Sequence, residues 1–170
     1  MNKWEINLNS LLVLILSAIL LGAFGIQIFK HEGPCPLCLL QRLGMIGVAC
    51  GALLNVKFGV RPAHYGLSLL SVLLGGFVAL RQIALHVCPD FSEFGEPFWG
   101  LSLYTWSFLV FVSTVAYIGL LLLIFDHRER PAGDAPINWF GQLAFALIFI
   151  AAVGNVGVSF WLCGLGPCFG

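Results

Sequence analysis

The chain has 170 residues, of which 59% are hydrophobic and only 9% are charged. A soluble domain carries roughly 25% charged residues, because its surface faces water. This chain has too few charged residues to cover a surface that faces water, so we expect lipid to be its main solvent. The formal net charge is zero with eight Lys and Arg in the whole chain, which argues against the basic face of a nucleic-acid-binding protein.

Five apolar segments are long enough to cross a membrane as helices, which requires roughly 20 residues each. The predicted spans are residues 11–29, 38–56, 65–85, 101–125 and 139–162. They indicate an all-α membrane protein, and we expect residues 1–170 to form a single integral membrane domain. The first segment is longer than the apolar core of a signal peptide, and no A-x-A cleavage site follows it, so it is expected to remain as a span.

The distribution of Lys and Arg predicts which ends of the spans face the cytoplasm. With a cytoplasmic N-terminus, the inner segments hold Lys3, Lys57, Arg61, Arg128 and Arg130. The outer loop 86–100 has no Lys or Arg, although Lys30 also lies on the outer side. This orientation places the C-terminal tail 163–170 outside. Disulfides persist on an oxidising side of the membrane, and the cysteines expected there are Cys35, Cys38, Cys88, Cys163 and Cys168.

The strongest local motif is Cys35-Pro36-Leu37-Cys38, at the start of the second span. Proline fits the first position of a helix, where its missing N–H costs nothing. Cys35 is therefore expected near the N-cap and Cys38 within the first turn. The unpaired N–H groups and the helix dipole at this end favour a thiolate, the form that attacks disulfides. The motif thus predicts a reactive thiol pair.

Arg42 follows Cys38 by four residues, which puts both side chains on one helical face. A charged side chain inside a span suggests a functional role. Arg42 could hold a Cys38 thiolate, or an oxygen of an electron acceptor, near the membrane surface. Alternatively, it could extend to the lipid headgroups with no chemical role.

A C-x-x-C motif has two other common uses in proteins. Covalent haem attachment needs C-x-x-C-H, and Leu39 follows the second cysteine here. A structural zinc site remains an alternative, in a membrane metal-binding or scaffold protein with structural outer-face cysteines. Its four ligands would be Cys35, Cys38, Cys163 and Cys168. Such a site gives no reason for an arginine beside the thiolates.

The run CPLCLLQR at residues 35–42 resembles the DsbB family of bacterial inner-membrane, quinone-linked disulfide bond formation proteins. A second stretch, WGLSLYTWS at residues 99–107, looks like the G-L-S-x-x-x-W pattern that opens the fourth helix of that family. The resemblance covers roughly residues 11–125. It implies a four-helix transmembrane bundle of the DsbB type, to which this chain adds a fifth C-terminal helix. It also implies a multi-pass protein of the bacterial inner membrane, for which the distribution of Lys and Arg predicts a cytoplasmic N-terminus and the fifth span a periplasmic C-terminus.

The same resemblance implies an enzyme, a quinone-dependent thiol:disulfide oxidoreductase. Electrons would pass from a periplasmic thioredoxin-like dithiol protein of the DsbA type, through cysteine pairs, to ubiquinone or menaquinone. By position, Cys38 would face the quinone, Arg42 would stabilise that contact, and Cys35 would exchange with a second cysteine pair. Arg81 and His86 are weaker candidates for the quinone pocket, because an arginine at the headgroups and an interfacial histidine explain them equally well.

The chain departs from the family pattern in its second cysteine pair. That family keeps the pair in the outer loop between the third and fourth spans, where this chain has only Cys88. The tail adds Cys163 and Cys168. The tail cysteines could pair with each other, Cys88 could pair with either of them, or all three could exchange. We favour the tail pair, because near neighbours close a disulfide with little loss of loop entropy.

Two features lie inside the spans rather than at their ends. Cys50 is expected about 18 Å deeper than Cys38 at 1.5 Å per residue, and we interpret it as a small packing residue. Gly75 and Gly76 could make room for a ligand, although small residues in a span more often serve close helix packing.

Overall fold

The computed structural model describes residues 3–30, 35–87, 97–124, 139–164 and 166. Within these ranges the chain forms five α-helices: α1 (Lys3–Phe29), α2 (Pro36–Phe58), α3 (Pro62–Val87), α4 (Leu103–Ile124) and α5 (Trp139–Cys163). All five are long and apolar enough to cross a membrane. The predicted all-α membrane fold with a fifth C-terminal helix is confirmed.

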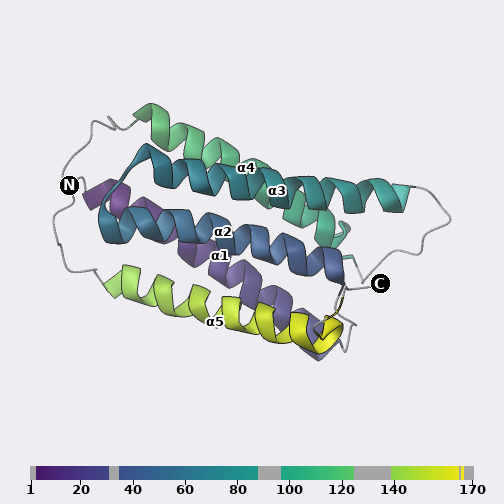
Figure 1. The fold of residues 1–170 in the computed structure, drawn as a ribbon. Coiled ribbons are helices and arrows are strands. Elements are labelled where there is room, and N and C mark those ends of the chain that lie inside the picture. Colours follow the sequence, from purple (N-terminus) through teal and green to yellow (C-terminus); the bar gives the residue numbers. More distant parts are fainter. Residues whose placement is uncertain (1–2, 31–34, 88–96, 125–138, 165, 167–170) are drawn as a thin grey trace.

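The helices run alongside one another, with α2 in the middle of the bundle (Figure 1). α2 packs most extensively against α3 and also contacts α1 and α5, while α4 packs mainly on α3. α5 packs against α1 as well as α2, so the extra helix is an integral part of the bundle. The C-terminal end of α5 lies at the same end of the bundle as the start of α2 (Figure 1).

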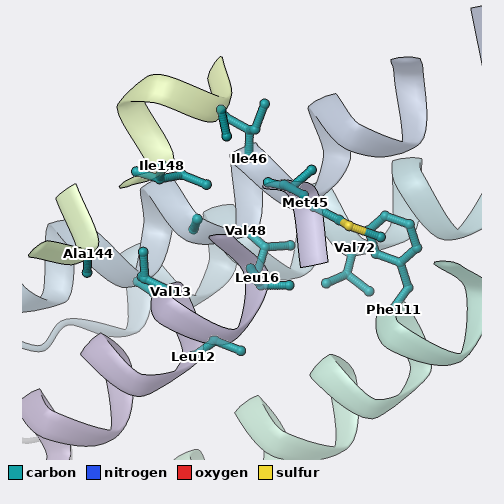
Figure 2. Close-up of a cluster of buried hydrophobic side chains, with 14 of the residues drawn as sticks. Leu12, Val13, Leu16, Met45, Ile46, Val48, Val72, Phe111, Ala144 and Ile148 are labelled. Atoms are coloured by element: carbon teal, nitrogen blue, oxygen red, sulfur yellow. The ribbon is translucent and has the colours of Figure 1, made fainter. Parts of the chain in front are cut away.

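Apolar side chains from all five helices form the core, and Figure 2 shows part of it. Val13 and Leu16 of α1 pack there with Val48 of α2, Phe111 of α4 and Ile148 of α5. Many large apolar side chains on the outside of the bundle are exposed, especially on α3 and α5. In lipid these side chains meet a solvent as apolar as themselves, so the outward face is consistent with a membrane environment.

α1 begins at Lys3, well before the predicted span start at residue 11. Three polar residues of this added stretch, Glu5, Asn9 and Ser10, are buried, so a search for apolar residues alone misses them. The Asn9 side chain donates to the Tyr65 hydroxyl at 2.9 Å and accepts from Asn55 at 3.1 Å. The Tyr65 hydroxyl donates to Glu5 at 3.3 Å. The Asn55 oxygen also accepts from His64 at 3.0 Å, and these five residues are called the asparagine cluster below.

Gly75 lies where three helices approach one another. A Cβ at this position would meet the Phe111 ring of α4 at less than the contact distance, and the Gly75 Cα itself lies 2.9 Å from a Cβ built at Gly44 of α2. The close helix packing considered for Gly75 and Gly76 therefore applies to Gly75. Gly76 has more room, with Phe111 at 3.7 Å from its built Cβ.

Candidate functional site

Cys35 and Cys38 lie at the N-terminal end of α2, as the motif predicts. Cys35 is the N-cap residue, with an extended backbone, and Pro36 occupies the first turn. The Cys35 sulfur accepts a hydrogen bond from the Cys38 backbone N–H at 3.4 Å. Both cysteines are free thiols and both are half-buried. The helix start therefore presents two adjacent sulfurs, one of which caps the helix.

The pKa of Cys35 is lowered well below its ordinary value, to about 6. The largest cause is a hydrogen bond from the Cys38 thiol. Burial opposes the shift, while the backbone N–H groups of Cys38 and Leu37 and the side chain of Gln82 add to it. This lowered pKa favours a thiolate on Cys35 in the reduced pair. The assignment of Cys38 as the sulfur that faces a quinone stays a prediction.

A buried glutamine from α3 completes the surroundings of the two sulfurs. The Gln82 amide nitrogen lies 3.7 Å from the sulfur of Cys35 and 3.7 Å from that of Cys38. Its amide oxygen accepts a hydrogen bond of 2.7 Å from the Gln41 side chain of α2. Gln82 and Gln41 are almost fully buried. Neither residue was predicted as part of the site, although an uncharged polar side chain within a span is itself a signal that another polar group lies opposite.

Arg42 extends across the bundle to α1. Its guanidinium donates to the Gln27 side chain at 2.8 Å and to the Ala23 carbonyl at 3.3 Å. It also lies over the Phe24 ring, 4.3 Å from the ring centroid. Arg42 interacts electrostatically with both thiols of the pair. Its side chain is therefore fixed inside the bundle beside the thiols.

An apolar cavity of about 480 Å³ opens beside the thiol pair. Ligand sites usually occupy roughly 300–1,000 Å³ and combine apolar walls with a few polar groups. The polar part of the lining includes both thiols, Arg42, Gln41 and Gln82. Most of the apolar wall comes from α1 and α4, including Ile19, Leu20, Ile26, Leu103 and Val110.

A tight turn before α4 adds an aromatic wall to this cavity. Phe98 lines the cavity and pairs with Leu101 through two backbone hydrogen bonds. Trp99 has a left-handed backbone, with φ 52°, and stacks on Phe98. The Trp106 indole N–H donates to the Phe98 carbonyl at 2.9 Å. This bond gives the tryptophan of the G-L-S-x-x-x-W stretch a structural role, because it secures the turn that carries Phe98.

The two weaker candidates lie near the cavity without lining it. Arg81 is exposed, whereas its neighbour Gln82 faces the thiols. His86 donates from Nδ1 to the Gln82 carbonyl at 2.7 Å, and its ring stacks on Tyr104, which does line the cavity. The roles proposed for Arg81 and His86 at a quinone remain predictions.

Of the remaining cysteines, the structure describes Cys50 and Cys163. Cys50 is a free, exposed residue of α2. Cys163 ends α5 and is disulfide-bonded, and its partner lies outside the described residues. Cys88 and Cys168 also lie outside them, so the wiring of the second pair remains open.

The state of Cys163 argues against the four-cysteine zinc site. A disulfide-bonded sulfur cannot serve as a zinc thiolate, and Cys163 is disulfide-bonded. In the part of the chain that the structure describes, no group of three His, Cys, Asp or Glu side chains is placed to hold a metal ion. The fourth ligand considered, Cys168, lies outside that part.

The chain is similar to known proteins of one family. Residues 6–93 match the family model "Disulfide bond formation protein DsbB". Disulfide bond formation protein B of Chromobacterium violaceum is 39% identical over 85 residues, covering 45% of this chain and 51% of that protein. The protein of the same name from Azoarcus sp. is 32% identical over 145 residues, covering 64% of this chain and 86% of that protein.

The extent of these matches differs between relatives. The chain spans about half the length of the Chromobacterium protein but most of the Azoarcus protein. The disulfide bond formation protein B of Polaromonas sp. is 29% identical over 151 residues, covering 68% of this chain and 89% of that protein. No solved structure gives a significant match.

Proposed function

Because the chain belongs to the family of the disulfide bond formation protein DsbB, we propose that it is a thiol oxidoreductase that passes electrons from a dithiol protein to a membrane quinone. The observation that carries this proposal is the thiol pair beside an apolar cavity. Cys35 and Cys38 both line a cavity of about 480 Å³ whose walls are mostly apolar. A free thiol pair with no cavity could exchange disulfides but would offer no place for a lipid-soluble electron acceptor.

The cavity fits the chemistry of a quinone. Its apolar wall between α1 and α4 suits a quinone ring and the first part of its isoprenoid chain, and Arg42 supplies a positive charge beside the thiols. A bound quinone would accept two electrons and two protons and leave as the hydroquinone. The residues that would hold it are Arg42 and the apolar side chains of α1 and α4. They suit ubiquinone and menaquinone equally well.

The thiol pair would act through its two sulfurs in turn. In its disulfide form, the Cys35–Cys38 pair accepts two electrons from an incoming dithiol, which becomes a disulfide as the pair becomes a dithiol. Cys35 then carries the thiolate, with its pKa lowered to about 6 by the Cys38 thiol. Loss of the same two electrons and two protons to the quinone restores the disulfide. Arg42 would balance negative charge beside the sulfurs throughout.

The second cysteine pair would connect this centre to a soluble partner. Cys163, already in a disulfide, ends α5 at the end of the bundle where α2 begins (Figure 1). We propose that Cys163 with Cys168, or with Cys88, exchanges with Cys35 on one side and with a periplasmic thioredoxin-like dithiol protein of the DsbA type on the other. The favoured pairing remains Cys163 with Cys168.

The proposed location is the bacterial inner membrane. A cytoplasmic N-terminus would put the start of α2 and the end of α5 on the periplasmic side, where disulfides persist. Labelling of the reduced protein in intact spheroplasts with a membrane-impermeant maleimide should therefore reach Cys35. Labelling only after the membrane is opened would contradict this orientation.

Quinone reduction by the purified protein tests the proposed function. The assay supplies dithiothreitol or a reduced thioredoxin-fold protein as electron donor and a short-chain ubiquinone analogue as acceptor. We expect Cys38→Ser to lower the rate by at least about a thousandfold, because a residue of the reacting pair is removed. Cys50→Ser is the matched control, since it makes the same change at an exposed cysteine of the same helix. Full quinone reduction by Cys38→Ser would rule out the proposal.

A further inference from the structure

Gln82 is the feature of the site that neither the motif nor the family resemblance explains. It comes from α3, yet its amide lies against both sulfurs at the start of α2. Its relative exposure is 1%, so water cannot replace the contacts that its amide makes. A buried amide group without hydrogen bonds is costly, and these contacts therefore constrain where it can point.

Gln41 determines the orientation of this amide. The Gln41 side-chain nitrogen can only donate, so the group facing it at 2.7 Å must be the Gln82 oxygen. The Gln82 nitrogen lies 3.7 Å from the Cys35 sulfur and 3.7 Å from the Cys38 sulfur, while the Gln82 oxygen also accepts from the Cys38 thiol at 3.9 Å. An amide nitrogen carries two hydrogens, which matches the two sulfurs that it faces.

Hydrogen-bond donors distinguish between the two redox states of the pair. The reduced pair carries a thiolate, which accepts hydrogen bonds strongly, whereas the sulfurs of a disulfide are uncharged and accept them weakly. A donor fixed beside the sulfurs therefore stabilises the reduced pair more than the oxidised pair. A thiol pair whose reduced form is stabilised is a stronger oxidant.

We propose that Gln82 is a catalytic residue that binds the Cys35 thiolate and favours the reduced form of the Cys35–Cys38 pair, and that Gln41 is the positioning residue that orients it. The inference rests on the proposed function in that the pair is taken to cycle between disulfide and dithiol. In that cycle Gln82 makes acceptance of two electrons from an incoming dithiol more favourable. Gln82 makes the onward transfer of these electrons to the quinone correspondingly less favourable. The free energy of the overall reaction is thus divided between reduction of the pair and its reoxidation.

Other groups also act on this thiolate. In the described part of the chain, the titratable and charged groups that interact with Cys35 are Cys38 and Arg42, both on α2. Gln82 is the contribution of α3, and it is uncharged. Its effect can therefore be separated from theirs by changing α3 alone.

The test measures the thiol pair without any quinone or partner protein. Reduced protein with the Cys50→Ser change is alkylated with iodoacetamide across a pH series, and modification of Cys35 is followed by mass spectrometry. The reduced protein is also equilibrated with reduced and oxidised glutathione. The midpoint of Cys35 alkylation in the otherwise unchanged protein is expected near pH 6, with the rate falling as pH falls below it.

Gln82→Met keeps a long side chain and removes the donor. We expect the Cys35 midpoint to rise by about one pH unit and the glutathione equilibrium to shift roughly tenfold toward the disulfide, which is about 30 mV. Gln41→Met leaves Gln82 in place but frees its orientation, so it should shift both quantities in the same direction by a smaller factor. Gln142→Met, an exposed glutamine at the start of α5, is the matched control and should change neither.

The outcomes separate this inference from the proposed function. An unchanged midpoint and an unchanged equilibrium in folded Gln82→Met protein would overturn the role of Gln82. If Gln82→Met does not fold, Gln41→Met decides in its place, since it retains Gln82. A shift in Gln82→Met without one in Gln41→Met would overturn the positioning role of Gln41. Failure of the wild-type protein to reduce quinone would refute the proposed function and leave these measurements valid.

Discussion

The two ends of the bundle both bury polar side chains, but they use them differently. At one end, the asparagine cluster joins α1, α2 and α3 through hydrogen bonds of 2.9 to 3.3 Å among its own members. At the other end, Cys35, Cys38, Gln41, Arg42 and Gln82, here called the thiol cluster, also join neighbouring helices. The thiol cluster, however, lines an apolar cavity of about 480 Å³.

The two clusters show that buried polar side chains can have a structural role or a chemical one. In the asparagine cluster, the Asn55 oxygen accepts from both His64 and the Arg61 backbone N–H while its nitrogen donates to Asn9, so its hydrogen-bonding capacity is largely used within the protein. In the thiol cluster, two free thiols and a guanidinium face a space large enough for a ligand. Polar groups that satisfy one another stabilise the fold, whereas polar groups arranged around a cavity are available for chemistry.

Loss of Arg42, at the end of the bundle that holds the thiol cluster, should have the largest effect on activity. We expect Arg42→Met to lower kcat/KM for quinone reduction by roughly a hundredfold, because a charge held beside the reacting sulfurs is removed from a site of low dielectric. Lys57→Met removes a positive charge from the exposed far end of the same helix and should leave the rate unchanged. Equal rates for Arg42→Met and the wild type would assign Arg42 to packing alone.

A smaller effect, and one on stability rather than activity, is expected at the asparagine cluster. Asn55→Leu leaves three hydrogen-bonding groups of Asn9, Arg61 and His64 without their partner. We expect a loss of about 2 kcal/mol in the free energy of unfolding, with an unchanged rate of quinone reduction per folded molecule. Unfolding in detergent, followed by circular dichroism, provides the measurement.

The matched control for this change is Asn7→Leu, which makes the same replacement at an exposed position of α1. It should lower stability much less. If Asn55→Leu instead lowered the rate while leaving stability intact, the division between a structural end and a chemical end would be wrong.

The smallest effect is expected inside the cavity, at a glycine of α1. Gly22 and Gly25 of α1 both have open space where a Cβ would lie, but only Gly22 is among the cavity-lining residues. The Cβ of Gly22→Phe would therefore meet no protein atom, and its ring is expected to occupy part of the cavity. We expect the KM for quinone to rise roughly tenfold, equivalent to about 1.4 kcal/mol of lost binding, while Gly25→Phe leaves it unchanged. A similar KM in both variants would place quinone binding elsewhere.

The sequence predicts the features of this protein that depend on local rules. The apolar length of each span indicates a membrane helix, and Pro36 after Cys35 predicts the capped start of α2. The spacing of Cys35, Cys38 and Arg42 suggests the resemblance to the family, which the match over residues 6–93 confirms. Each of these conclusions needs only neighbouring residues.

Features that depend on distant residues were not predicted. Gln82 reaches Cys38 across 44 positions of sequence, and nothing in the pattern of α3 distinguishes its role from that of the adjacent Arg81. The early start of α1 has the same origin, because Asn9 is buried only through contacts with Asn55 and Tyr65. Such contacts arise from helix packing, which apolar patterns locate only coarsely.

An anaerobic titration tests whether the Cys35–Cys38 pair passes its electrons to a quinone. Reduced Cys50→Ser protein is mixed with increasing amounts of a short-chain ubiquinone analogue, hydroquinone is measured by absorbance, and thiol loss is mapped by mass spectrometry. We expect one hydroquinone for every two thiols lost, with the loss beginning at Cys35 and Cys38. Quinone that stays oxidised while both thiols persist, or thiols that disappear without hydroquinone, would contradict electron transfer from this pair to a quinone.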